Sequence, residues 1–544
     1  MREPRAMERL VAPGEGVGLR EPGPVVGWVL LSALVLATVA AGLVGNGDLK
    51  LALAPLLLAL LVCLVAVLPL RLPMLTLLVL AWALEVPGDA FAEGLVKTPW
   101  TMVGALLFGR LNQTLPVLSA EWLIPGLGQV FTPLVMSGLD LLVVLMFGVI
   151  AYRHHHRSRI DRTGWVDGPA PIRSFAWLSV LAVAWMCVWG FLHGGAPRFM
   201  FWQSLRWLYI PIIYALMRQA LRGMPDALTV GKLLLGVGLF RAGEAILFRS
   251  WYPSVEVMGF ATTHFDTVLF STCLAILGAL LLEMPSPATF RLAVLLAPIY
   301  YWAIRANNRR LAYADLALIA LVFWFISPWR PIKRRAARVL ALFSLPILLY
   351  VGVGWTSEAG PFGPVQKFRS MLDPKADTST LWRELENTNL VFTYHESPLL
   401  GLGFGRPFHE HVKLPDVTGS YELEPYVPHN SVLGLWAFGG LLGFSLLWAI
   451  FPVGFFFTVR AYRWASTPME RVTALGAAAV QVCYLIQGYA DLGFGSWGPV
   501  FTVATSYALV GKICVANGAW GRPRAEDVPA GGPVVVALPH PEKA

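Results

Sequence analysis

Apolar runs long enough to cross a membrane recur along almost the whole chain, from near Val25 to near Cys514. A helix of about 20 apolar residues spans a hydrocarbon core of roughly 30 Å and satisfies its own backbone hydrogen bonds there. Only 14% of the residues are charged, whereas about a quarter are charged in a soluble domain. Alternating strands of about ten residues, typical of an outer-membrane barrel, are absent. The sequence therefore predicts an all-α, polytopic transmembrane protein.

The apolar runs predict about 14 spans (12–14) and one large periplasmic loop. The predicted spans are 25–45, 51–69, 72–86, 132–151, 173–192, 205–220, 228–247, 266–283, 291–304, 311–327, 337–355, 431–457, 471–489 and 496–515. The predicted organisation is a cytoplasmic tail at 1–24, spans one to eleven within 25–355, the periplasmic loop at 356–430, spans twelve to fourteen within 431–515, and a cytoplasmic tail at 516–544. A further stretch, 98–108, is either interfacial or re-entrant.

Lysine and arginine are concentrated on alternate loops, and this predicts the orientation of the chain. With a cytoplasmic N-terminus, the basic clusters at 153–173, 330–338 and 460–471 all fall on the cytoplasmic side. Inner-membrane proteins keep basic loops in the cytoplasm. We therefore expect both termini there and the protein in the bacterial inner membrane. The net charge of +9 reflects orientation and does not indicate nucleic-acid binding.

Two segments break this charge pattern. The long loop at 356–430 carries basic residues, but long loops are exempt from the rule. The short turn after the span 291–304 places Arg305, Arg309 and Arg310 outside, and charges at such positions indicate function. The alternative is that this span is misassigned and the turn is cytoplasmic. Within the spans charges are few, and Arg241 and Glu244 are expected to pair because they lie three residues apart.

The outer loop has internal structure in its sequence. Residues 378–395 predict a helix with Arg383, Glu386 and Leu390 at helical spacing. Residues 397–407 form a Gly/Pro turn, and the string EPYVPHN ends the loop where the span at 431 begins.

Metal and disulfide chemistry are not expected. All five cysteines lie in or beside apolar runs, and none shows CxxC spacing. His409, Glu410 and His411 are adjacent, a spacing that does not place ligands on one helical face.

Three motifs carry a family resemblance. The strings ESPLLGLGFGRPF (396–408) and PHNSVLGLWAFGGLLGF (428–444) resemble the signature of the O-antigen ligase and O-antigen polymerase superfamily, with Arg383 fifteen residues before Pro398 and the pair His429–Asn430 opening a helix. The turn AIRANNRRLAYADLAL (303–318) is similar to the family's arginine-bearing turn. The residue before the family's arginine is usually serine, and here it is Asn308 or Arg309, so Arg309 and Arg310 both stay open as the equivalent.

The resemblance implies a reaction and its partners. Members transfer a glycan from a polyprenyl-diphosphate carrier, such as undecaprenyl diphosphate, to a saccharide hydroxyl, with inversion and with no metal or cofactor. A polymerase in O-antigen or exopolysaccharide biosynthesis is the first expectation. The alternative is a ligase of lipopolysaccharide biosynthesis that passes the finished chain to lipid A-core. Membrane lipids, a flippase and a chain-length regulator are the implied neighbours. A transporter or flippase is the alternative of another class, but it would favour charges in the middle of several spans and two related halves. This sequence has few mid-span charges and no evident half-repeat.

The residues fit this chemistry. Guanidinium groups bind phosphate oxygens in pairs, which predicts diphosphate binding by Arg305, Arg309, Arg310 and Arg383. Histidine titrates near neutral pH, so His429 is predicted either to take the acceptor proton or to bind diphosphate as a cation. Asn430 and Glu396 are expected to support His429, and Glu396 or Glu410 to orient it or bind sugar. The alternative for His429 is a helix-entry residue that hydrogen-bonds backbone, with Asn430 as the helix cap. The alternative for Arg383 is a solvated helix position paired with Glu384 or Glu386.

Overall fold

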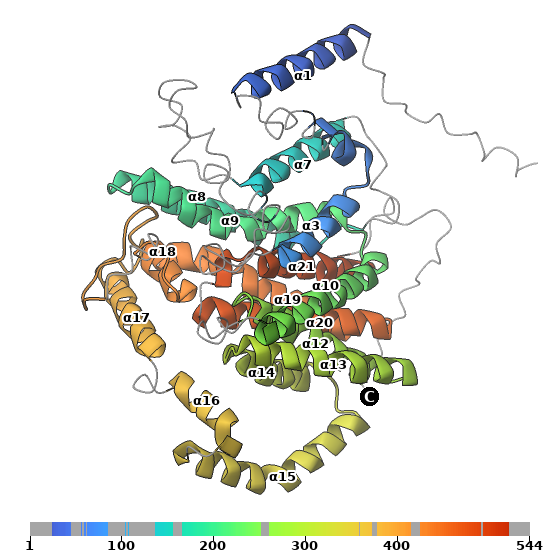
Figure 1. The fold of residues 1–544 in the computed structure, drawn as a ribbon, viewed down its shortest axis with the longest axis vertical. Helices are drawn as coiled ribbons and strands as arrows, with labels where there is room; N and C mark the ends of the chain where they lie inside the picture. Colours follow the sequence, from blue (N-terminus) through green and yellow to red (C-terminus); the bar gives the residue numbers. More distant parts are fainter. Residues whose placement is uncertain are drawn as a thin grey trace, which may run out of the picture.

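The computed structural model describes residues 24–44, 137–155, 166–251, 261–357, 360–372, 378–414, 425–490 and 493–521, together with most of 56–84 and residues 104 and 107. Every regular element in these ranges is helical (Figure 1), which confirms the all-α prediction. The two tails and nearly all of the stretch 98–108 lie outside the described residues.

The helices follow the predicted spans closely. They are α1 (Pro24–Val44), α3 (Arg71–Ala83), α7 (Gly138–His155), α8 (Ala170–Leu192), α9 (Pro197–Ala220), α10 (Met224–Trp251), α12 (Asp266–Glu283), α13 (Pro287–Asn307), α14 (Leu311–Ile326), α15 (Pro331–Thr356), η2 (Gly360–Phe362), α16 (Gly363–Leu372), α17 (Thr378–Glu396), α18 (Ser431–Trp448), α19 (Ile450–Trp464), α20 (Pro468–Ala490), η4 (Gly493–Gly495) and α21 (Trp497–Ala516). Within the described ranges, seven helical segments are long and apolar enough to cross a membrane. The chain is a multi-pass membrane protein, and the total of about 14 spans stays a prediction.

One predicted span differs from the structure. The run 431–457 was expected to be a single helix, but α18 and α19 divide it, and α18 itself bends at Gly440 (φ 56°, ψ −163°). Hydropathy registers only that the run is apolar, so it cannot locate a kink produced by tertiary contacts.

Local sequence signals explain several helix ends. Proline occupies the first turn of α8, α9, α13 and α15, where its missing N–H costs no hydrogen bond. A capping box opens α13, because Ser286 Oγ accepts from Thr289 N at 3.1 Å and Thr289 Oγ1 accepts from Ser286 N at 2.9 Å. The same helix ends at Asn308, whose left-handed conformation (φ 50°) is one that asparagine tolerates.

The centre of the bundle is formed by α20 and α21, which pack against α12, α9 and α19 (Figure 1). Large side chains such as Tyr484, Phe501 and Tyr507 are fully buried there. In contrast, α15 packs on η2 and α16, and its apolar side chains are exposed along its length. Such a surface suits contact with lipid.

Ion pairs hold together one end of the bundle. Glu283 at the end of α12 accepts from Arg330 at 2.9 Å and Arg471 at 2.6 Å. Arg218 at the end of α9 donates to Asp167 before α8 at 2.6 Å. These arginines belong to the loops predicted to be cytoplasmic, and each forms an ion pair with a carboxylate.

The arginine turn and the outer loop lie at the other end. The start of α12 meets the end of α13 there, since Ala261 N donates to Asn307 Oδ1 at 3.1 Å. Near the start of α9, Gln203 Nε2 donates to the Tyr426 carbonyl at 2.6 Å. The turn and the loop therefore share one end of the bundle, as expected if both are outside. The periplasmic assignment of that end stays a prediction from the charge pattern.

Candidate functional site

The helix α17 presents a buried polar face to α18. Its predicted range, 378–395, is confirmed by Thr378–Glu396. Trp382, Glu386, Asn389, Leu390 and Thr393 recur at three- and four-residue spacing and so share one face. All except the half-buried Trp382 are fully buried. A helix that buries a carboxyl and an amide on its inner face must supply them with hydrogen-bond partners.

His429 and Glu386 meet between α17 and the start of α18. The backbone N–H of His429 donates to both Glu386 oxygens, at 3.0 and 3.2 Å. The His429 ring Nδ1 lies 3.3 Å from Glu386 Oε1. The carboxyl is inaccessible to solvent, while the imidazole keeps 21% of its side-chain exposure. A carboxylate at Nδ1 favours the tautomer that carries its proton on Nδ1 and its lone pair on Nε2.

The His429 ring is held by further contacts. Trp382 packs against it edge to face, with ring centroids 4.5 Å apart. Asn430 caps α18 by accepting from Leu433 N at 3.0 Å, which confirms its predicted capping position. Two buried donors, Asn430 Nδ2 and Trp382 Nε1, have no hydrogen-bond partner in the described part of the chain. A buried unpaired donor costs about 1–3 kcal/mol, so an oxygen-rich ligand would gain by binding here.

The Gly/Pro turn supplies the hydrogen bonds that the bend of α18 breaks. In a straight helix, N–H groups 441 and 442 would donate to carbonyls 437 and 438. Instead Leu441 N donates to Pro398 O at 2.8 Å and Leu442 N to Leu399 O at 3.0 Å, while carbonyls 437 and 438 accept from backbone N–H groups 402 and 403 at 3.0 and 2.8 Å. The turn therefore lies in the bend and fixes the direction of the first half of α18.

This insertion explains the glycines of the motif. A Cβ at Gly440 would lie 2.5 Å from Gly401 N, and a Cβ at Gly401 would overlap the Phe438 carbonyl. On the other side the turn contacts α8, where a Cβ at Gly190 would overlap the Phe404 backbone. The turn glycines thus allow close backbone contacts with α18 and α8, which spacing along the chain cannot show.

The other predicted carboxylates lie elsewhere in the loop. Glu396 at the end of α17 hydrogen-bonds His409 Nδ1, and Glu410 Oε1 accepts from Leu414 N at 2.6 Å. Asn389 Oδ1 accepts from the backbone N–H groups of His411 and Val412 at 2.9 and 2.7 Å. These contacts tie the loop to α17. The carboxylate that orients His429 is therefore Glu386, not Glu396 or Glu410.

The remaining predicted residues are arginines. Arg383 is half-buried on α17, one turn before Glu386. Arg309 and Arg310 are half-buried in the turn between α13 and α14. Arg305 is exposed, and its Nη1 lies 3.4 Å from the hydroxyl of Tyr313 at the start of α14. The structure thus joins His429 to Glu386 and Trp382, and it places the turn arginines at the same end of the bundle.

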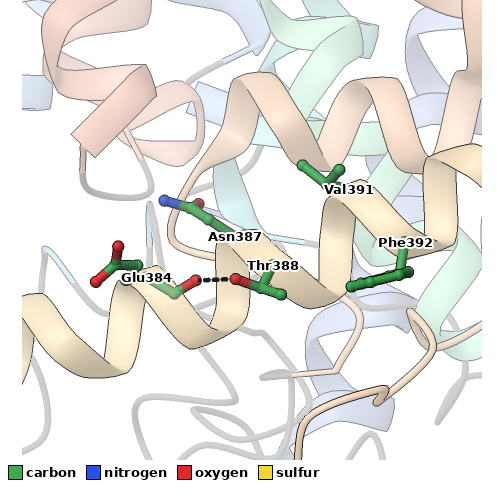
Figure 2. A pocket seen from close by; sticks show the side chains of 5 residues that line it. All are labelled: Glu384, Asn387, Thr388, Val391 and Phe392. Atoms are coloured by element: carbon green, nitrogen blue, oxygen red, sulfur yellow. Dashed lines mark hydrogen bonds between the residues drawn. The ribbon is translucent and has the colours of Figure 1, made fainter.

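The opposite face of α17 carries a hollow of about 240 Å³. Its lining residues follow one another along the helix, as Figure 2 shows: Glu384, Asn387, Thr388, Val391 and Phe392. This side lies about half a helical turn away from Glu386. Within the described residues, no three His, Cys, Asp or Glu side chains converge as a metal site would require.

Glu386 and Trp382 are the site residues that the sequence did not predict as functional. Glu386 was noted only as a partner for Arg383. The available signal was the stripe of Trp382, Glu386, Asn389 and Thr393 at helical spacing, because polar residues repeated on one face of a helix indicate a buried polar contact. Nothing in that stripe identifies His429, 43 residues later, as the partner.

Comparison with known families finds a match to one part of the chain. Residues 292–448 match a family model described as O-Antigen ligase, which confirms the resemblance carried by the motifs. The match begins within α13 and ends with α18, so it includes the arginine turn, α17 and His429. It covers less than a third of the chain. No curated protein matches this sequence.

Proposed function

We propose, from the premise that residues 292–448 form an O-antigen ligase domain, that this chain is a membrane glycosyltransferase acting on a polyprenyl-diphosphate-linked glycan at the periplasmic face. Its acceptor is a hydroxyl of the next lipid-linked repeat unit, which makes the enzyme a polymerase of O-antigen or exopolysaccharide. The single observation that supports this most is the His429–Glu386 pair at the mouth of α18.

His429 acts as the general base. With its Nδ1–H donated to Glu386, the Nε2 lone pair takes the proton of the acceptor hydroxyl as that oxygen attacks the anomeric carbon. The new C–O bond forms while the bond to the diphosphate breaks, so the carrier leaves as polyprenyl diphosphate with the electron pair. One displacement inverts the anomeric configuration. The unpaired donors of Trp382 and Asn430 favour a sugar or phosphate oxygen beside His429.

The arginines stabilise the departing diphosphate. Arg383 on α17 and Arg305, Arg309 and Arg310 of the turn are permanently charged and form bidentate bonds to phosphate oxygens. Each charge-assisted bond contributes about 1.5–3 kcal/mol, and it accelerates the reaction when it is stronger in the transition state. Because these guanidinium groups neutralise the leaving group, the reaction needs no metal ion.

The test compares His429→Ala with His411→Ala in a knockout strain. His411 lies in the same loop, is exposed and stacks on Phe392 at 3.9 Å, so its loss leaves the His429–Glu386 pair intact. His429→Ala should abolish glycan transfer at normal membrane levels, and His411→Ala should retain it. Purified enzyme should keep its activity in a strong chelator. Wild-type transfer by His429→Ala would overturn the proposed mechanism.

Lipid-linked intermediates from the knockout identify the acceptor. Single repeat units on the carrier, without long chains, indicate a polymerase. Long chains that accumulate on the carrier and never reach lipid A-core indicate a ligase. Single repeat units retained on the cytoplasmic side of the membrane, with both products missing outside, would indicate a transporter.

A further inference from the structure

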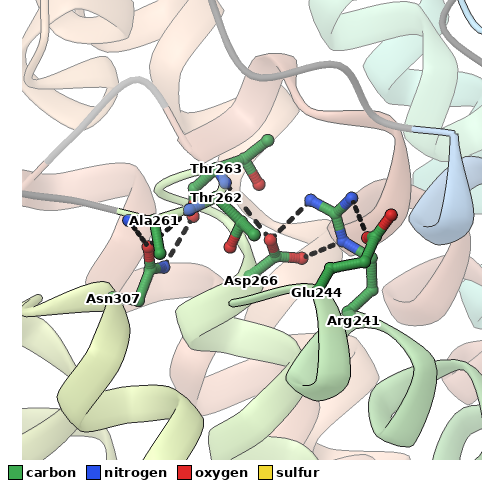
Figure 3. A network of polar contacts seen from close by, with 7 residues as sticks. All are labelled: Arg241, Glu244, Ala261, Thr262, Thr263, Asp266 and Asn307. Atoms are coloured by element: carbon green, nitrogen blue, oxygen red, sulfur yellow. Dashed lines mark hydrogen bonds and ion pairs between the residues drawn. The ribbon is translucent and has the colours of Figure 1, made fainter. Parts of the chain in front are cut away.

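A buried polar network joins α10 to the start of α12 and the end of α13, through the residues drawn in Figure 3. Arg241 on α10 is 4% exposed and donates to both oxygens of Asp266, at 3.0 and 2.6 Å, and to Glu244 at 2.8 Å. The sequence predicted the pairing with Glu244, and the structure adds Asp266 at the start of α12. Two carboxylates thus pair with this guanidinium, and the pair with Asp266 links α10 to α12.

Asn307 connects this network to the end of α13. Its Oδ1 accepts from the backbone N–H groups of Ala261 and Thr262, at 3.1 and 3.0 Å, and its Nδ2 donates to the Thr263 carbonyl at 2.9 Å. Thr263 N in turn donates to Asp266 at 3.2 Å. The Asn307 side chain thus makes three hydrogen bonds to the segment before α12, and the residue is 1% exposed.

The arginine turn begins directly after this anchor. Asn308 adopts the left-handed conformation that ends α13, and Arg309 and Arg310 follow before α14. The direction in which the chain leaves α13 therefore decides where both guanidinium groups lie. We propose that Asn307 is a positioning residue, which fixes the arginine turn against α12 so that it meets the donor diphosphate. This inference rests on the proposed function.

The expected effect is specific to the donor. Asn307→Leu keeps a branched side chain of similar length but removes three hydrogen bonds, so the turn shifts relative to α12. A displacement of about 1 Å at a substrate-positioning group lowers the rate about a hundred-fold. We expect about that fall in kcat/KM, as a raised KM for the lipid-linked donor with an unchanged KM for the acceptor. Asn307→Asp keeps the two accepted bonds and loses the donated one, so its effect should be intermediate.

A matched control separates positioning from stability. Gln481 is a buried amide on α20 that donates to Thr458 at 2.7 Å, and Gln481→Leu removes that bond away from the turn. A structural loss lowers the amount of folded enzyme, and thus the apparent kcat, with both KM values unchanged. The double variant Arg309→Ala/Arg310→Ala is measured in the same assay, with and without Asn307→Leu. This comparison tests whether Asn307 affects donor binding through the two arginines.

The outcomes are distinct. If Asn307 acts through the turn, the triple variant has the same donor KM as the arginine variant. If the arginine variant raises the donor KM but Asn307→Leu does not, the positioning role is refuted and the proposed function stands. If the arginine variant keeps the wild-type donor KM, diphosphate binding by the turn is refuted, and the positioning role with it.

Discussion

Replacing Glu386 by glutamine tests the site most directly, because the change removes one charge and almost no volume. The carboxylate accepts two donors from His429, the backbone N–H and the ring Nδ1. Glutamine has one acceptor oxygen and one NH₂ group. With its oxygen toward Nδ1, the NH₂ group faces the backbone N–H across 3.0 Å. If the side-chain amide is flipped, its NH₂ group faces Nδ1 and donates to it, so the imidazole proton moves to Nε2.

The magnitude follows from these two arrangements. A hydrogen bond to a charged group contributes about 1.5–3 kcal/mol and a neutral one about 0.5–1.5 kcal/mol. The interaction that orients the His429 ring therefore becomes weaker by about 1 kcal/mol. Protonation of Nε2 removes the general base, which contributes about 10²–10⁴-fold. The corresponding acid-to-amide change in a serine protease triad lowers kcat about 10⁴-fold. We expect kcat to fall about 10²–10⁴-fold, or about 3–5.5 kcal/mol.

The assay is the initial rate of glycan transfer by purified enzyme in lipid nanodiscs, with lipid-linked repeat units at saturation. Glu384→Gln is the matched control, because it makes the same change two residues away on the exposed face of α17. Both variants are compared at equal amounts of folded protein, measured by thermal unfolding. A Glu386→Gln rate within twofold of wild type would refute the pairing of Glu386 with a catalytic His429.

Three further predictions concern the scaffold and the charges. Gly440→Ala should destabilise the protein by at least about 3 kcal/mol, seen as lost accumulation in membranes, because the backbone there suits only glycine and the new Cβ would meet Gly401. Arg383→Lys should lower transfer at least tenfold, because an ammonium cannot form a bidentate bond to phosphate. Burial raises the pKa of the Asp167 carboxyl. Two hydrogen bonds from Arg218, together with its positive charge, have the larger combined effect and hold that pKa below its usual value. The pair therefore stabilises the fold above about pH 4 and loses this effect as pH falls through the folded pKa, so Asp167→Asn should cost about 0.5–1 kcal/mol at pH 7 and progressively less as pH falls through that folded pKa.

Each of these has a contrary outcome. Gly236→Ala in α10, where a Cβ meets no atom within 4 Å, controls for helix glycines in general, and equal accumulation of both variants would remove the packing explanation. Arg369→Lys on α16 is the control for Arg383, and wild-type transfer by Arg383→Lys would exclude a bidentate role. A stability difference for Asp167→Asn that stays constant as the pH is lowered until Asp167 is protonated in the folded protein would show that the ion pair is not its cause.

The helices could be predicted from sequence because each depends on its own residues. The run 266–283 coincides with α12 and 471–489 lies inside α20, since a span must be apolar and its ends are marked by polar groups. The amphipathic spacing of 378–395 likewise predicted α17. The family resemblance could be recognised because its motifs are short and local, and the comparison with known families confirms it for 292–448.

By itself, then, the sequence determined an all-helical membrane protein with the ligase motifs in one late region, and it named His429 as the central residue. Only the tertiary structure decided what His429 contacts, why α18 bends at Gly440, and how Asn307 and Asp266 bond to the segment before α12. The physical reason is that these contacts join groups far apart in the chain, such as Glu386 and His429. A buried carboxyl or amide must find a partner, but its own segment does not specify which one, because that choice depends on how the helices pack.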